Sequence, residues 1–201
     1  MLTMMPMAAC DGSNADPILP EQPGQPGNSD GGDEDDSTDP TNPIPGGNGR
    51  YLVLYCSRTG STERMAQQIQ QTLDCDILEV EPQTPYESDY NGMLNRAQEE
   101  LAAIRQGNYP AIKTSVEDFG NYDIVFVGYP IWYGSMATPM QTFLHNHASK
   151  LAGKRIALFA SSGSSGISAS VDEARTLCSG ATFTETLLLT SSTLSQMGNR
   201  I

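Results

Sequence analysis

The stretch that decides the fold is Tyr51-Leu52-Val53-Leu54-Tyr55-Cys56-Ser57-Arg58-Thr59-Gly60-Ser61-Thr62. Its first half is a continuous apolar run of strand length, which suits a strand buried on both faces of a parallel sheet. Its second half is a polar loop with a glycine. The residues that follow place Met65, Ala66, Ile69 and Leu73 on one face of a helix. We therefore expect a strand, a tight loop and a helix in succession.

Four further apolar runs have the length and composition of strands. They are Asp76–Val80, Tyr122–Gly128, Arg155–Ala160 and Thr184–Thr190. Helical segments separate them, and Asp76–Val80 completes a βαβ unit with the first strand and helix. Alternating strands and helices predict an α/β fold: a doubly wound, five-stranded parallel sheet between two helical layers.

Residues 83–122 are longer than a simple connection. Within them, Tyr90, Met93, Leu94, Ala97, Leu101 and Ile104 fall on one helical face, and Tyr109-Pro110 closes that helix. Two interpretations stay open. The helix is either a peripheral one packed on the sheet, or part of a remodelled loop that contacts a ligand.

Three helix starts are predicted from capping patterns. Thr138, followed by Pro139 and Gln141, opens one helix after a loop at Tyr129–Met136, and Ser170 with Glu173 opens another after a loop at Ser161–Ser168. A third pattern, Thr193 with Gln196, starts a helix that the sequence ends after roughly two turns. We expect this final helix to be truncated, and the N-terminus to be incomplete as well.

Ligands of open parallel sheets bind outside the carboxyl ends of the strands, where three loops of unusual composition are predicted. In the first, Ser57–Thr62, the N–H groups of a helix N-terminus and several hydroxyls suit a phosphate monoester. The loop lacks the lysine of a nucleoside-triphosphate site. It also has Thr62 where a low-molecular-weight tyrosine phosphatase, with Cys56 as nucleophile, needs an arginine. Both of those functions are therefore disfavoured.

The three loops together resemble those of the flavodoxin family. The first fits the pattern T/S-x-T-G-x-T, the second is Gly128-Tyr129-Pro130-Ile131-Trp132-Tyr133-Gly134, similar to a G-x-P-x-W-x-G signature, and the third is Ser161-Ser162-Gly163-Ser164-Ser165-Gly166. The resemblance covers residues 50–190 in the right order. It implies a flavodoxin-like fold and FMN bound without a covalent bond.

The resemblance also implies a role for each loop. The cofactor phosphate would be bound by Ser57, Arg58, Thr59, Gly60, Ser61 and Thr62. The isoalloxazine ring would lie against Pro130, Ile131, Trp132, Tyr133 and Gly134, and the ring or ribityl chain would border Ser161, Ser162, Gly163, Ser164 and Gly166. The alternatives are a core position for Trp132 and an ordinary loop at 163–166.

Composition separates residues 11–49 from the rest. They are rich in Gly, Pro, Asp, Asn and Ser, and they hold nine of the 24 acidic residues and none of the 11 basic ones, which leaves 15 acidic and 11 basic residues, a net −4, for residues 50–201. We expect a disordered acidic tether before a single domain at 50–201. The sequence lacks the basic stripe that nucleic-acid binding requires, so nucleic acid is not expected as a partner.

The first ten residues resemble the end of a bacterial lipoprotein signal, because Met7-Ala8-Ala9-Cys10 is similar to a lipobox whose cysteine is lipidated. The resemblance implies a domain anchored by lipid in the cell envelope. Against it, the segment has no positively charged start and only a short apolar stretch. The alternative is an unrelated Met-rich start and a cytoplasmic protein.

Three functions follow as hypotheses. The favoured one is an electron carrier that shuttles between redox partner proteins. The others are an FMN-dependent oxidoreductase that passes hydride from a nicotinamide to a quinone-like small acceptor, and a cofactor-free binding module on a tether. Cys56, Cys75 and Cys178 are expected to be small buried residues without metal spacing, and His145 and His147 are expected at the surface.

Overall fold

The computed structural model describes residues 50–190 and residue 193. The predicted tether, the lipobox-like segment with Cys10, and the predicted final helix apart from Thr193 lie outside the described residues. Five parallel strands run in the order β2-β1-β3-β5-β6, as the doubly wound sheet predicts. Their bounds are β1 Tyr51–Tyr55, β2 Asp76–Glu79, β3 Ile124–Trp132, β5 Arg155–Ser162 and β6 Thr182–Thr190.

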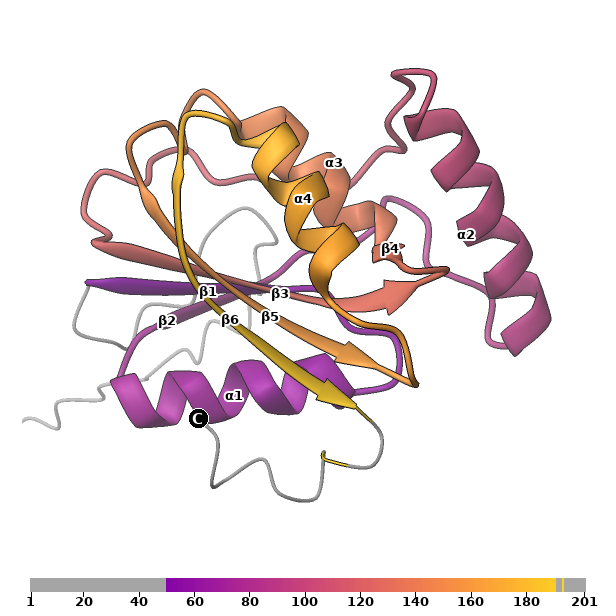
Figure 1. Ribbon diagram of the computed structural model, residues 1–201, viewed down its shortest axis with the longest axis horizontal. Helices are drawn as coiled ribbons and strands as arrows, with labels where there is room; N and C mark the ends of the chain where they lie inside the picture. Colours follow the sequence, from indigo (N-terminus) through magenta and orange to yellow (C-terminus); the bar gives the residue numbers. More distant parts are fainter. Residues whose placement is uncertain (1–49, 191–192, 194–201) are drawn as a thin grey trace, which may run out of the picture. The chain divides into compact units, whose positions relative to one another are not determined.

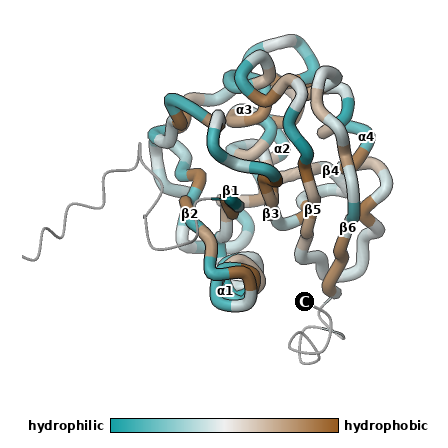
Figure 2. The backbone as a smooth tube through the Cα atoms, turned by 90° about the vertical axis from the view of Figure 1, so that its left-hand side faces the viewer, coloured by the Kyte–Doolittle hydropathy of each residue, from teal (hydrophilic) through white to brown (hydrophobic). Residues whose placement is uncertain are grey.

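Helices cover both faces of this sheet (Figures 1 and 2). The helix α1, Ser61–Leu73, lies on one face, while α3, Thr138–His147, and α4, Ser168–Leu177, lie on the other. The fourth helix, α2, Tyr90–Ile104, lies beyond the carboxyl ends of the strands, toward which the arrowheads point in Figure 1. The three-layer α/β/α arrangement is therefore confirmed.

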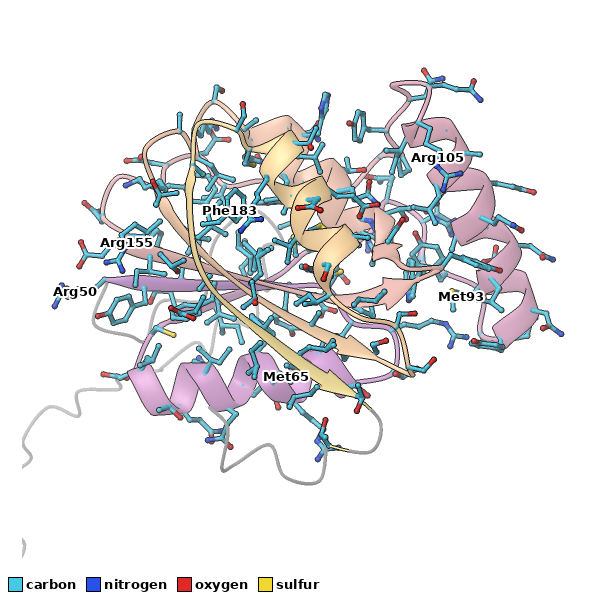
Figure 3. All side chains as sticks on the ribbon, in the orientation of Figure 1. Arg50, Met65, Met93, Arg105, Arg155 and Phe183 are labelled. Atoms are coloured by element: carbon cyan, nitrogen blue, oxygen red, sulfur yellow. The ribbon has the colours of Figure 1, made fainter. Side chains whose placement is uncertain are left out.

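Each sheet face buries alternate residues of the central strands. Leu52 and Leu54 of β1 belong to the core under α3 and α4, and Val53 packs with Met65 of α1 on the opposite face. Figure 3 shows Met65 between α1 and the sheet. In Figure 2 much of the hydrophobic colour lies along the strands. Because both faces are covered, β1 is apolar throughout rather than alternating.

The segment expected to be a loop at Tyr129–Met136 is largely strand. The strand β3 continues to Trp132 and pairs antiparallel with a short added strand, β4, Ser135–Met136. Tyr133 (φ 51°) and Gly134 (φ 80°) form the turn, and two successive positive φ values are typical of a type I′ hairpin. The sequence does not predict this continuation of β3, because a proline such as Pro130 is rare inside a strand. Similarly, β5 runs on to Ser162, into the expected loop Ser161–Ser168.

Both predicted capping boxes on the α3 and α4 side are wrong. Ala137 and Ile167 are the N-cap residues, and neither cap has a side-chain hydrogen bond. The Thr138 hydroxyl instead donates to Glu100 (2.5 Å), and the Ser170 hydroxyl donates to the Ile167 carbonyl (2.8 Å). In both cases the hydroxyl expected to cap the helix bonds a residue that is not part of the capping motif.

The two histidines of the α3 end differ. His145 is exposed as expected and stacks on Tyr109, whereas His147 is buried, so the surface prediction is wrong for it. The Nδ1 of His147 lies 2.9 Å from the Phe143 carbonyl, and its Nε2 accepts from the Val116 amide at 3.2 Å. The imidazole is held in the core because both of its nitrogens have partners.

Candidate functional site

The first loop turns from β1 into α1 through Gly60. Gly60 is the N-cap residue with φ 79°, a left-handed conformation that glycine adopts without steric cost, and its carbonyl accepts from the Arg64 amide at 3.0 Å. No side chain caps this end of α1. The positive end of the helix dipole therefore faces the loop, which is the arrangement that binds anions.

The third loop is tied to the first. The buried hydroxyls of Thr62 and Ser161 lie 2.8 Å apart and share a hydrogen bond. The next residue, Ser162, has a buried hydroxyl with no hydrogen-bond partner among the described residues. Since buried polar groups are almost always paired, this hydroxyl is a candidate donor or acceptor for a ligand.

All three loops meet in one cavity of about 380 Å³, named here the three-loop cavity. It is lined by twelve of the predicted site residues: Ser57, Arg58, Thr59, Ser61, Thr62, Pro130, Ile131, Trp132, Tyr133, Ser161, Ser162 and Gly163. Gly60 and Gly134 instead form the turns beside it, and Ser164 and Gly166 lie between β5 and α4 without lining it. The volume is within the range of small-molecule sites.

Three residues of α2 also line this cavity and were not predicted to do so. They are Tyr90, Met93 and Leu94. Met93 is buried and lies on the side of α2 that faces the sheet (Figure 3). The helical face of α2 was recognised in the sequence, but nothing in its spacing distinguishes a face that packs on a sheet from one that lines a cavity. These three residues of α2 therefore belong to the wall of the candidate site, and contact between residues 83–122 and a ligand stays a prediction.

Arg58 joins the first loop to the start of α2. One guanidinium nitrogen donates to the backbone carbonyls of Glu87, Ser88 and Asp89 at 3.3, 3.0 and 3.3 Å. The guanidinium also lies over the Tyr90 ring, 6.0 Å from its centroid. Arg58 therefore fixes the wall of the cavity as well as placing a positive charge beside it.

A second cavity of about 450 Å³, named here the β2-side cavity, lies next to the first. The two share Ser57, Arg58, Thr59, Pro130 and Trp132. The remaining walls come from Cys56, from the end of β2 to Pro82, from residues 85–88, and from Lys113 and Pro139. Trp132 thus lies between two cavities, and its ring makes an edge-to-face contact with Tyr86 (5.0 Å, 79°).

Glu79, the last residue of β2, carries the most perturbed carboxyl group of this region. Burial, then the nearby carboxylates Glu81 and Glu63, raise its pKa to about 7, against the lowering effect of hydrogen bonds from Tyr55 and the Ser57 backbone. The Tyr55 hydroxyl lies 3.4 Å from Glu79 Oε2. Near neutral pH, the protonated and the ionised forms of Glu79 are therefore both populated.

Cys56 does not supply a nucleophile. It is buried at the end of β1, and burial together with the charge of Glu79 raises the pKa of its thiol. A thiol that stays protonated is a poor nucleophile, so the phosphatase interpretation is disfavoured by the environment of Cys56 as well as by Thr62. Cys75 and Cys178 are also buried free thiols, as expected.

The family model for flavodoxins matches residues 50–200. The chain belongs to the flavodoxin family. A protein from Bacteroides eggerthii described as a flavoprotein is 32% identical, with a TM-score of 0.63 over 74% of this chain and 92% of that one. A second, from Bacteroides uniformis, is 28% identical, with a TM-score of 0.63 over 77% and 97%.

A third solved structure bears on the cofactor of this flavodoxin. A flavoprotein from Lactobacillus acidophilus, crystallised in complex with FMN, is 26% identical, with a TM-score of 0.60 over 74% of this chain and 97% of that one. The search of curated proteins found no match. None of the helices in the described part of this flavodoxin is long and apolar enough to cross a membrane.

Proposed function

We propose that this flavodoxin is an electron carrier that binds FMN in the three-loop cavity and exchanges electrons with redox partner proteins. The observation that carries the proposal is the convergence of three loops, from β1, β3 and β5, on one cavity whose chemistry changes from polar to apolar across it. FMN has the same asymmetry, with a phosphate at one end and an aromatic ring at the other.

The polar end suits the phosphate. The uncapped N-terminus of α1 offers backbone N–H groups, and Ser57, Thr59 and Ser61 add hydroxyls from the same loop. Arg58 supplies the positive charge. The absence of lysine from the loop suits a monoester rather than a triphosphate.

The apolar end suits the ring. Trp132 and Tyr133 stand on the β3–β4 hairpin, and Met93 and Leu94 face them from α2. Tyr133 is 53% exposed and has φ 51°, a conformation that costs a non-glycine residue energy and that recurs at functional sites. Ser162 lines the same cavity, and its buried hydroxyl, which has no partner among the described residues, is a candidate to bond a polar rim atom of the ring or the ribityl chain. Bound FMN supplies the redox chemistry, while these residues bind it, orient it and exclude water.

The test compares FMN with riboflavin, which lacks the phosphate. The full chain is titrated with each flavin and followed by flavin fluorescence, in the wild type and in Ser61→Ala. A hydrogen bond to a charged group contributes about 1.5–3 kcal/mol, so the variant should bind FMN about tenfold or more weaker and riboflavin unchanged. A wild type that binds neither flavin would support the cofactor-free binding module instead.

The alternative function is an FMN-dependent NAD(P)H:quinone-type oxidoreductase. The β2-side cavity favours it, because a cavity that shares Trp132 with the flavin site is a place for a small electron acceptor. Rapid NAD(P)H oxidation by the FMN-loaded protein with added quinone, and without a partner protein, would support the enzyme. No NAD(P)H oxidation with quinone, together with electron transfer to a partner protein, would support the carrier.

We also propose that the flavodoxin is lipid-anchored in the cell envelope through Cys10. The support is the sequence Met7-Ala8-Ala9-Cys10 and the acidic, Pro- and Gly-rich segment after it. In the native host, wild-type protein should fractionate with membranes and Cys10→Ala should not. Equal soluble fractions of both would support a cytoplasmic protein.

A further inference from the structure

The β2-side cavity is larger than the three-loop cavity, about 450 against 380 Å³, and the proposed FMN contacts leave most of it unused. The residues that belong to this cavity alone come from several parts of the chain: Cys56 after β1, Glu79–Pro82 at the end of β2, Pro85–Ser88 before α2, and Lys113 and Pro139. A cavity of this volume is large enough for a small organic molecule.

Part of the wall of the β2-side cavity is made of rigid, apolar side chains. Pro82, Pro85, Pro130 and Pro139 line it together with Trp132. Tyr86, in edge-to-face contact with Trp132, adds a second aromatic ring. Proline and aromatic faces with little rotational freedom are suited to a planar aromatic ligand, which stacks at low entropic cost.

The charged groups of the wall favour an uncharged ligand. Lys113 pairs with Glu81 at 3.6 Å, and Arg58 is held by the carbonyls of residues 87–89. The charge of Lys113 is thus balanced by Glu81, and the charge of Arg58 is the one assigned to the FMN phosphate, which leaves no further cation of the wall for a second anion. A ligand with a carboxylate, sulfonate or phosphate would instead meet the carboxyl groups of Glu79, Glu81 and Glu87, which line the same cavity.

Glu79 differs from the other two acidic residues. No ion pair to it occurs within the described part of the chain, and its side chain is half-buried. The groups that face it are Tyr55 and Cys56 of the β1 end, Glu63 of α1 and the neighbouring Glu81. Burial and the carboxylates of Glu81 and Glu63 favour the neutral acid and outweigh the opposing hydrogen bonds from Tyr55 and the Ser57 backbone. Glu79 can therefore donate a hydrogen bond into the cavity at neutral pH.

We propose that the β2-side cavity binds an uncharged, planar aromatic carbonyl compound, a class that includes quinones, with Glu79 donating a hydrogen bond to its carbonyl oxygen. Pro82, Pro85 and Trp132 pack on its rings. The proposal goes beyond the carrier function, because a ligand at this position contacts the same Trp132 as the cofactor and gives the flavodoxin a small-molecule site of its own. Its binding does not require FMN.

The test uses chromone, a redox-inert planar carbonyl compound, and calorimetric titration of the full chain saturated with FMN. Chromone should bind, and its affinity should fall as the pH rises from 6 to 9, approaching tenfold per pH unit once Glu79 is ionised. The Glu79→Gln variant keeps a hydrogen-bond donor that does not titrate. Its affinity should stay within about twofold across that range.

Two controls test whether the pH dependence comes from Glu79 and whether the cavity prefers an uncharged ligand. Glu99→Gln removes an exposed carboxylate of α2 outside both cavities and should keep the wild-type pH profile. Chromone-2-carboxylate, which carries a negative charge, should bind at least tenfold weaker than chromone to the wild type.

Three results would overturn the inference. They are no chromone binding, loss of chromone binding when FMN saturates the protein, and the same pH profile in Glu79→Gln as in the wild type. The FMN titration of the same sample is read separately. FMN binding without chromone binding removes only this inference, and chromone binding without FMN binding removes only the proposed function.

Discussion

At the scale of single residues, the cofactor loop depends on one left-handed glycine. Gly60 has φ 79°, and a Cβ added there would meet only the Glu63 Oε2 atom, at 3.8 Å. A side chain at this position is therefore disfavoured by backbone conformation and not by crowding. The backbone dihedral angles of Gly60 also set the direction in which the first N–H groups of α1 point.

Replacing Gly60 with alanine should lower the free energy of unfolding by about 1–2 kcal/mol, the cost of a left-handed L-residue. FMN binding should weaken as well, because relief of the strain turns the N–H groups of the first turn. Urea unfolding and FMN titration measure the two effects. Gly166→Ala is the matched control: Gly166 lies outside the left-handed region with open space around it, so its variant should be as stable as the wild type or slightly more so. Equal losses in both variants would contradict the role given to the Gly60 conformation.

At the scale of elements, α2 and the chain before it are held at the site by a cluster of polar side chains. Arg96 bonds Glu100 at 2.8 Å and the carbonyls of Pro85 and Thr84 at 2.8 and 2.9 Å, and its guanidinium lies over the Tyr86 ring at 4.2 Å. The Tyr86 hydroxyl donates to Glu100. Arg96 and Glu100 are only 22% and 12% exposed, so this pair is shielded from water.

Arg96→Met should therefore destabilise the fold by about 3 kcal/mol, because it leaves the carboxylate of Glu100 largely buried without its cation. The double variant Arg96→Met, Glu100→Gln should recover much of that loss. Urea unfolding gives the free energies, and hydrogen exchange should show the amides of residues 84–89 losing protection first. Arg175→Met, which breaks an exposed pair with Asp172, should cost less than 1 kcal/mol. A similar loss from both arginines would mean that shielding of the Arg96 pair contributes nothing.

The elements also show what the sequence could predict. The five parallel strands and their order along the chain were predictable because buried strands and amphipathic helices leave strong periodic signals. The capping residues were not, since the Thr138 hydroxyl bonds Glu100, a residue far away in the sequence. The β3–β4 hairpin was missed because Pro130 interrupts the strand pattern and Tyr133 takes a conformation that is usual for glycine or asparagine.

At the scale of the whole molecule, the topology assembles the site. The parallel strands β1, β3 and β5 are neighbours in the sheet, so the loops after them meet although residues 57–62 and 161–163 are far apart in the chain. The predicted loop residues therefore converge as the topology requires. The contribution of α2 could not be predicted, because nothing local in residues 90–94 indicates where a helix outside the sheet will lie.

Two groups, the buried His147 and the half-buried Glu79, influence the pH dependence of stability in opposite directions. Burial lowers the pKa of His147 below 6.5, so its contribution is full above pH 6.5 and is lost as the pH falls through the lower folded pKa. Glu79 has a folded pKa of about 7 against an ordinary 4.5, so its contribution is full below pH 4.5 and is lost as the pH rises to 7. Below pH 6.5 the two effects oppose each other, so the wild-type stability should depend less on pH there than the stability of either single variant.

Single variants should separate these effects in urea unfolding of the FMN-free chain between pH 4.5 and 8. Without the titrating imidazole, His147→Gln should lose stability steadily as the pH rises from 5 to 7, because the Glu79 effect is no longer offset. Glu79→Gln should show the reverse, gaining stability over the same range. His145→Gln, which removes the exposed neighbour of the same helix, should keep the wild-type profile. Parallel pH profiles for all three variants would show that the two buried groups do not control the acid and neutral stability of this fold.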